Sequence, residues 1–375
     1  MLPRLALCAL ALTLAACATA QDEGLTDRTL PGFSTNTAQR AIDLGELRAG
    51  GPPKDGIPSI DEPVFVSAGE AADWLEPQEP VVALTLGGET RAYPLQILTW
   101  HEIVNDVFEG GAAPVAVTFC PLCYSAVAFD RRVETEGGTR TLTFGVSGFL
   151  RYSDLVMFDR ETETLWQQLT GDALVGDLLG TQLTVHPAQI VSFEQFRAAY
   201  PESRVLSRET GHTRDYGRNP YAGYDDIDRQ PFLFDGPEDD RLRPMEKVVA
   251  LKLDGAEKAY PYTLTREQRV VNDEAAGTPL VVFHADGAVS ALDAAEIAAS
   301  RQAGSTGVFD RRAGGQTLTF QWDDGFVDTE TGSRWDVTGR AVAGPLAGTQ
   351  LARLPHGDYF AFAWLAFKPE TEIYR

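Results

Sequence analysis

The fold is decided by the stretch VVALTLGGETRAYP at residues 81–94, because VVALKLDGAEKAYP at residues 248–261 repeats it. The similarity continues in the same order along both copies, with VND at 104–106 and 271–273, FDRR at 129–132 and 309–312, TLTF at 141–144 and 317–320, Trp166 and Trp335, GTQL at 180–183 and 348–351, and Pro-Glu at 201–202 and 369–370. Self-similarity of this kind predicts tandem units. We interpret the chain as an internal duplication, with a first unit at 63–206 and a second at 246–375.

Each copy has the pattern of a β-rich α+β unit. Short alternating runs such as 114–119 and 141–144 lie between Gly-Gly or Asp-rich turns, which is typical of strands and hairpins. We expect one helix per copy after the Tyr-Pro pair, because Ile97, Trp100, Val104 and Phe108 recur at helical spacing. The expected fold is therefore two tandem α+β units.

The first residues predict an export signal and a lipid anchor. Arg4 precedes an apolar run at 5–14, and LAAC at 14–17 is typical of a bacterial lipobox. We expect a signal peptide at 1–16, lipid attachment at Cys17 and a tether and entry loop at 17–62. The protein would then be held in the periplasm or cell envelope, and Ala18 favours the outer membrane.

Charge and composition exclude one class of partner. The formal net charge is −22, and Lys and Arg do not cluster, so we expect no nucleic-acid partner. The acidity is typical of a solvated surface. The partners that we expect are a periplasmic redox protein or a small-molecule substrate.

The remaining cysteines form one close pair. Cys8 leaves with the signal and Cys17 takes the lipid, so Cys120 and Cys123 remain for chemistry. This spacing suits thiol exchange or metal binding. A permanent disulfide closing so small a loop would contribute only about 2 kcal/mol.

The context of the pair argues against a thioredoxin fold. The run at 125–130 alternates like a strand, whereas thioredoxin has a long helix after its cysteines. Tyr124 occupies the place of the histidine that haem attachment requires. In the second copy, FHADG at 283–287 aligns with FCPLC at 119–123, and Gln268 aligns with His101. The first copy is therefore the expected active half.

Four stretches together resemble the family called domain of unknown function 3179. They are GPPKDGIP at 51–58, WHEIVND at 100–106, TFCPLC at 118–123 and RDYGRNPY at 214–221. No activity is assigned to this family. Some members are described as selenoproteins with selenocysteine in the Cys-Pro-x-Cys region, and the resemblance therefore implies redox chemistry at Cys120 or Cys123.

Three hypotheses remain open for the pair. In the leading one, Cys120 attacks a substrate, Cys123 resolves the mixed disulfide and His101 assists. In the second, Cys120, Cys123, His101 and Met157 bind Cu(I) or zinc. In the third, a static disulfide belongs to a binding module. We expect no cofactor apart from the metal ion of the second hypothesis. Glu102 is either an acid/base partner or a solvated helix residue, and we expect the latter.

A long connector at 207–245 joins the two units. Its length and aromatic content favour a functional covering loop over a solvated linker. Its polar residues either contact a substrate or tie the connector down by hydrogen bonds; they are Arg214, Asp215, Arg218, Asn219 and Tyr221.

Overall fold

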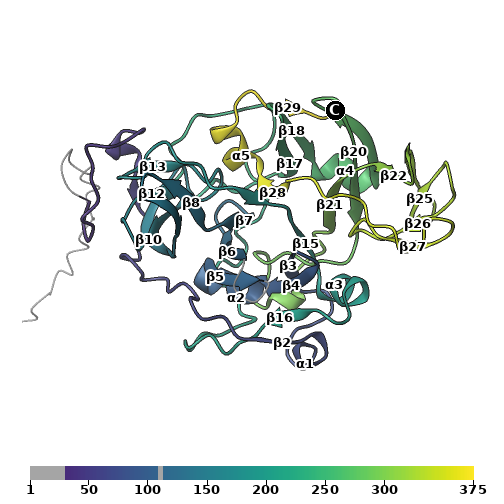
Figure 1. Ribbon diagram of the computed structural model, residues 1–375, viewed down its shortest axis with the longest axis horizontal. Helices are drawn as coiled ribbons and strands as arrows, with labels where there is room; N and C mark the ends of the chain where they lie inside the picture. The colour runs from purple at the N-terminus through teal and green to yellow at the C-terminus, as the bar shows by residue number, and fades with distance from the viewer. Residues whose placement is uncertain (1–29, 109–112) are drawn as a thin grey trace, which may run out of the picture.

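The computed structural model describes residues 30–108 and 113–375 and is rich in β-structure, with 41% strand and 11% helix (Figure 1). The β-rich α+β prediction is therefore confirmed. The predicted signal peptide and Cys17 lie outside the described residues. Within the described part of the chain, no helix is long and apolar enough to cross a membrane.

The first half contains three main sheets. One has the order β15-β3-β4-β16-β2, with β15 at Ala188–Ser192, β3 at Pro80–Leu86, β4 at Glu89–Pro94, β16 at Arg204–Leu206 and β2 at Phe65–Ser67. A second has the order β14-β7-β6-β5, with β14 at Val185–His186, β7 at Ser125–Asp130, β6 at Ala113–Cys120 and β5 at Ile103–Phe108. The third has the order β1-β10-β11-β12-β13, with β1 at Arg48–Ala49, β10 at Phe144–Arg151, β11 at Asp154–Asp159, β12 at Leu165–Gln167 and β13 at Ala173–Val175.

Short elements complete this half. They are the hairpin of β8 (Arg132–Thr135) and β9 (Gly138–Thr141), the 3-10 helix η1 (Leu44–Glu46), and the helices α1 (Ala68–Ala71), α2 (Leu95–His101) and α3 (Phe193–Ala199). Capping boxes begin α1 at Ser67 and α3 at Ser192, where each serine accepts a hydrogen bond from the backbone of the third helical residue.

The second half repeats this order of elements. Its first sheet has the order β28-β17-β18-β29, with β28 at Gly357–Phe360, β17 at Lys247–Leu253, β18 at Ala256–Pro261 and β29 at Glu372–Ile373. Its second sheet has the order β19-β20-β21, with β19 at Val270–Ala275, β20 at Thr278–Ala285 and β21 at Ser305–Asp310. Its third sheet has the order β24-β25-β26-β27, with β24 at Phe320–Trp322, β25 at Phe326–Asp328, β26 at Arg334–Trp335 and β27 at Ala341–Ala343. The remaining elements are β22 (Arg312–Ala313), β23 (Gln316–Thr317), α4 (Tyr262–Gln268), η3 (Ile297–Ala299) and α5 (Ala361–Phe367).

The two halves share their hydrophobic core. Strand β28 of the second half contacts β7 of the first, and β15 of the first half contacts β21 of the second (Figure 1). One cluster accordingly joins Phe193 and Phe196 to Phe283 and Phe309, while another joins Phe119 and Tyr124 to Phe360. Each half therefore buries part of its apolar surface against the other.

The structure shortens the helix that we expected after the Tyr-Pro pair. Helix α2 ends at His101, and Val104 and Phe108 lie on β5 instead. Both residues are buried, because every second residue of a strand faces the core, and the spacing of four also fits a helix. Residues 30–62 also differ from a free tether: β1 pairs with β10, and Leu44 and Leu47 pack against Val156 and Phe158.

Candidate functional site

The cysteine pair lies in the tight turn between β6 and β7. Cys120 is the last residue of β6, and the Cys123 amide donates to the Cys120 carbonyl at 3.3 Å. Pro121 suits the second position of such a turn, since its ring fixes φ near −65°. The turn brings the two sulfurs to 3.9 Å, with both cysteines free. Because strand β7 follows the turn, neither cysteine begins a helix, the position at which a helix dipole lowers the thiol pKa in many Cys-x-x-Cys motifs.

Asp154, at the start of β11, completes a cluster with the two thiols. Its carboxylate oxygen and the two sulfurs all lie within 4.8 Å of one another, and all three residues are buried. Its Oδ2 accepts hydrogen bonds from Gln167 Nε2 at 2.6 Å and from the Leu169 amide at 3.0 Å. Its Oδ1 meets no donor of normal hydrogen-bond geometry in the described part of the chain. Asp154 can therefore accept a proton from a thiol or ligate a metal ion together with both sulfurs.

Burial shapes the acidity of all three groups. It raises the pKa of Cys120, while the hydrogen bond from the Cys123 thiol opposes that effect. It raises the pKa of Cys123 well above the usual value, and Cys120 and Asp154 add to the increase. Burial also raises the pKa of Asp154 to about 6, so this carboxyl is mostly ionised at neutral pH. Cys120 is thus the more acidic thiol, and Asp154 is a base beside it.

Glu102 is the second buried carboxyl near the thiols. Only 6% of it is exposed, which corrects our expectation of a solvated helix residue. Burial raises its pKa to about 8, although the Tyr221 hydroxyl donates to Oε1 at 3.5 Å and opposes the effect. Its φ of 58° ends α2 in the left-handed conformation. The equivalent Arg269 has the same conformation, so the fold explains this backbone but not the carboxyl.

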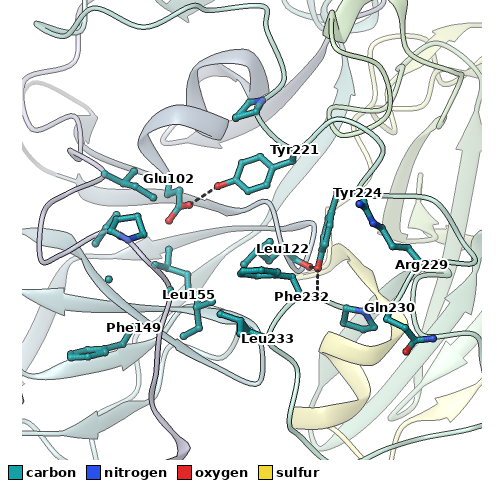
Figure 2. A pocket seen from close by; sticks show the side chains of 18 of the residues that line it. Glu102, Leu122, Phe149, Leu155, Tyr221, Tyr224, Arg229, Gln230, Phe232 and Leu233 are labelled. Atoms are coloured by element: carbon teal, nitrogen blue, oxygen red, sulfur yellow. Dashed lines mark hydrogen bonds between the residues drawn. The ribbon is translucent and has the colours of Figure 1, made fainter. Parts of the chain in front are cut away.

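A pocket of about 590 Å³ opens beside the cysteine turn (Figure 2). Its walls come from the 50–57 loop, from β10 and β11, and from residues 220–233 of the connector. Glu102 and Leu122 lie on its inner side, and Tyr224 donates to the Leu122 carbonyl at 3.1 Å (Figure 2). The connector therefore closes the pocket directly over Leu122, one of the two residues between the cysteines.

His101 is held by two hydrogen bonds outside the thiol cluster. Its Nδ1 lies 2.7 Å from the Pro58 carbonyl, which only accepts, so Nδ1 carries the proton. Its Nε2 then accepts from the Tyr216 hydroxyl at 2.7 Å. Burial lowers its pKa to about 4 and keeps it neutral. His101 fastens the entry loop and the connector to α2, and its assistance to the thiols stays a prediction.

The other predicted residues of the connector divide into two groups. Tyr221 lines the pocket and contacts Glu102. Asn219 donates through its side chain to the Ala294 carbonyl at 3.0 Å, and Arg218 pairs with Glu296, so both tie the connector to the second half. Arg214 is half-buried, whereas Asp215 is exposed and lies 3.8 Å from Arg218. Met157 is buried in the core cluster that joins Phe119 to Phe360.

A family model described as a protein of unknown function (DUF3179) matches residues 54–371. The chain belongs to the DUF3179 family. The match spans both halves and the connector, as the sequence resemblance predicted. Neither the curated proteins nor the solved structures contain a match to this chain.

Within this DUF3179 chain, strand register corrects our alignment of the two halves at the cysteines. Ile103 and Val270 are equivalent residues of the two halves. Ile103 pairs with Thr118 and Val270 pairs with Phe283, so Phe283 is equivalent to Thr118 rather than to Phe119. Cys120 therefore corresponds to Ala285, and the short cysteine turn corresponds to the long 286–304 loop. The cysteines remain features of the first half alone.

Asp154 was missed because it lies in an extension that the second half lacks. In the first half the β10–β11 hairpin continues to the pair Arg151 and Asp154, whereas the corresponding β24–β25 hairpin ends at Trp322 and Phe326. A signal was present in the sequence: the interval from TLTF to the matched tryptophan is longer in the first copy, 144–166, than in the second, 320–335. Asp154 therefore lies in a segment of the first half that has no equivalent in the second half.

Proposed function

We propose that this DUF3179 protein is a thiol redox protein whose Cys120–Cys123 dithiol cycles with a disulfide. One observation carries the proposal, namely two reduced sulfurs 3.9 Å apart beside the buried Asp154 carboxylate. A disulfide needs the sulfurs to approach to about 2.05 Å, which a change of side-chain torsion within the turn can supply.

Asp154 moves the protons in the proposed reaction. It takes the proton of Cys120, and the Cys120 thiolate attacks one sulfur of a substrate disulfide. Asp154 passes that proton to the departing thiolate. Cys123 then loses its proton to Asp154 and attacks Cys120, and the second departing thiolate takes the proton. Two thiols are oxidised to one disulfide, and the substrate is reduced to two thiols.

Glu102 serves as a neutral hydrogen-bond donor, whereas Asp154 carries the protons. Two carboxyls whose environments separate their pKa values, about 6 for Asp154 and about 8 for Glu102, suit base and acid roles at neutral pH. Protonated Glu102 adds no charge that would oppose the Cys120 thiolate, and it can donate a hydrogen bond to the departing sulfur.

The test is a stoichiometric oxidation of the full chain, purified anaerobically. We expect a small disulfide to oxidise the pair and release two equivalents of thiol. A Cys120→Ser/Cys123→Ser variant measures the background from Cys8 and Cys17. Release no greater than this background, from protein whose Cys120 and Cys123 are free, would refute the proposal.

A metal site is the second candidate, and the sulfur geometry favours it. Tetrahedral zinc with Zn–S bonds of about 2.3 Å separates two sulfurs by about 3.8 Å, close to the observed distance. Cys120, Cys123 and Asp154 could supply three ligands, with Asp154 in the place that we expected for His101. Stoichiometric zinc or copper in anaerobically purified protein, lost in Asp154→Ala, would place this function first.

We also propose, as a separate matter, that Cys17 carries a lipid anchor in the cell envelope. The LAAC motif supports it. Mass spectrometry of the protein from bacterial membranes tests it, and an unmodified mature N-terminus would contradict it.

A further inference from the structure

We propose that the substrates of the cysteine pair are uncharged, apolar disulfides that enter through the pocket between the 50–57 loop, β10–β11 and the connector. This inference rests on the proposed redox function and names the substrate class for the same site. The pocket volume of about 590 Å³ suits a small organic molecule.

The inner end of the pocket meets the thiol cluster through three contacts. Leu122 lines the pocket and is the residue between Pro121 and Cys123. Leu155 also lines it and directly follows Asp154. The Cys120 sulfur lies 4.0 Å from the Ser153 carbonyl, and the Ser153 hydroxyl donates to the carbonyl of Phe232 on the outer wall. The inner end of the pocket therefore adjoins both segments that carry the thiol cluster, and a bound disulfide reaches the Cys120 sulfur when the side chain of Leu122 or Leu155 moves aside.

The walls select against charge. They are formed mainly by Pro, Val, Leu, Phe and Tyr side chains, and the lining residues with ionisable acidic or basic groups are Glu102 and Arg229. Arg229 donates to the Gly223 carbonyl and lies on the far side of Tyr224 from Glu102 (Figure 2). An anionic substrate reaching the inner end would meet a carboxyl and no cation. Buried charge without a partner is costly, so anions such as glutathione disulfide are disfavoured.

The rim of the pocket is apolar and exposed. Phe232 is 49% exposed and Leu233 is 42% exposed, and both line the pocket. Leu233 has φ of 49°, a conformation that leucine adopts rarely. The connector thus holds an exposed apolar side chain in the pocket lining at some conformational cost.

The chemistry of this step balances without another reactant. The Cys120–Cys123 dithiol loses two electrons and two protons and forms one sulfur–sulfur bond. One sulfur–sulfur bond of the substrate breaks, and the substrate becomes two uncharged thiols. Both products are apolar and can leave by the same pocket.

The experiment compares two disulfide probes on the reduced full chain: neutral 4,4′-dithiodipyridine and dianionic 5,5′-dithiobis(2-nitrobenzoate). Each rate is divided by the rate for the same protein unfolded in urea, which corrects for the intrinsic reactivity of the probes. The Cys120→Ser/Cys123→Ser variant corrects for other thiols. We expect the folded protein to favour the neutral probe at least tenfold.

Leu233→Asp supplies the matched test of the pocket. Aspartate tolerates positive φ better than leucine, so the fold is retained. Val342→Asp is the control, because Val342 is 57% exposed in the second half, where the same charge is added outside the pocket lining. We expect Leu233→Asp to slow the neutral probe at least fivefold and Val342→Asp to leave it unchanged.

The outcomes separate this inference from the proposed function. Equal normalised rates for both probes, or equal effects of the two aspartate variants, would overturn the apolar-disulfide inference while two-electron oxidation of the pair still occurred. Failure of both probes to oxidise the free pair would overturn the redox function and this inference with it.

Discussion

Replacing Asp154 by asparagine should slow thiol exchange and stabilise the protein. Asparagine keeps a carbonyl oxygen for the hydrogen bonds from Gln167 and Leu169, but it cannot accept a proton from a thiol. General-base catalysis contributes about 100-fold or more, so we expect at least a 100-fold loss in the rate of dithiol oxidation at pH 7.

The magnitude of the stabilisation follows from the pKa of Asp154. Burial raises it from 3.8 to about 6, so the folded chain binds this proton more tightly than the unfolded chain. Stability is then lost as pH rises from about 4 to about 6, by roughly 3 kcal/mol in total. The asparagine side chain carries no such loss, and Asp154→Asn should be more stable than wild type by up to roughly 3 kcal/mol at pH 8.

Two measurements on wild type and Asp154→Asn test the predicted loss of rate and gain of stability. Stopped-flow oxidation by 4,4′-dithiodipyridine gives the rate, and urea unfolding at pH 5 and pH 8 gives the free energies. The sign of the rate change is diagnostic, because removing a buried negative charge without a base role would lower the thiol pKa values and speed the reaction. A faster or unchanged rate in Asp154→Asn would refute the base assignment.

The roles of the two cysteines, the pH profile and His101 each give a further test. Cys123→Ser should accumulate a mixed disulfide with the probe at Cys120, visible by mass spectrometry, whereas Cys120→Ser should form far less; the reverse pattern would exchange the roles of the cysteines. The oxidation rate should rise with pH through about 6 as Asp154 ionises and fall through about 8 as Glu102 ionises, and Glu102→Gln should lose only the alkaline fall. His101→Gln should cost about 1–3 kcal/mol of stability, because it disturbs buried hydrogen bonds to Pro58 and Tyr216, while the thiol oxidation rate stays within about twofold; a much larger loss of rate with little loss of stability would instead restore His101 as a partner of the thiols.

The repeated motifs predicted the β-rich architecture, because strand alternation and turn residues are local properties. The strand after the cysteines was predicted from the alternation at 125–130 and is β7. The end of α2 was not predictable by periodicity, since buried residues four apart suit both a helix and a strand. The left-handed conformation at Glu102 ends the helix there, and no glycine marks that position in the sequence.

The site was predicted only where its residues are adjacent in sequence. Cys120 and Cys123 share one turn, whereas Asp154 reaches them through the register of a separate hairpin. Glu102 was judged by its charge, which favours solvent, but it is buried, and its partner Tyr221 belongs to the connector, far away in the sequence. His101 was chosen because it is absent from the second copy, and that absence is explained equally well by its contacts with Pro58 and Tyr216.

The reduction potential of the Cys120–Cys123 pair in metal-free full chain tests the central claim most directly. A pair that exchanges with substrates should equilibrate with a redox buffer at a potential between about −300 and −120 mV, with the protein folded in both states. A potential below about −300 mV would identify a structural disulfide, and a dithiol that cannot close without unfolding would contradict the redox function altogether.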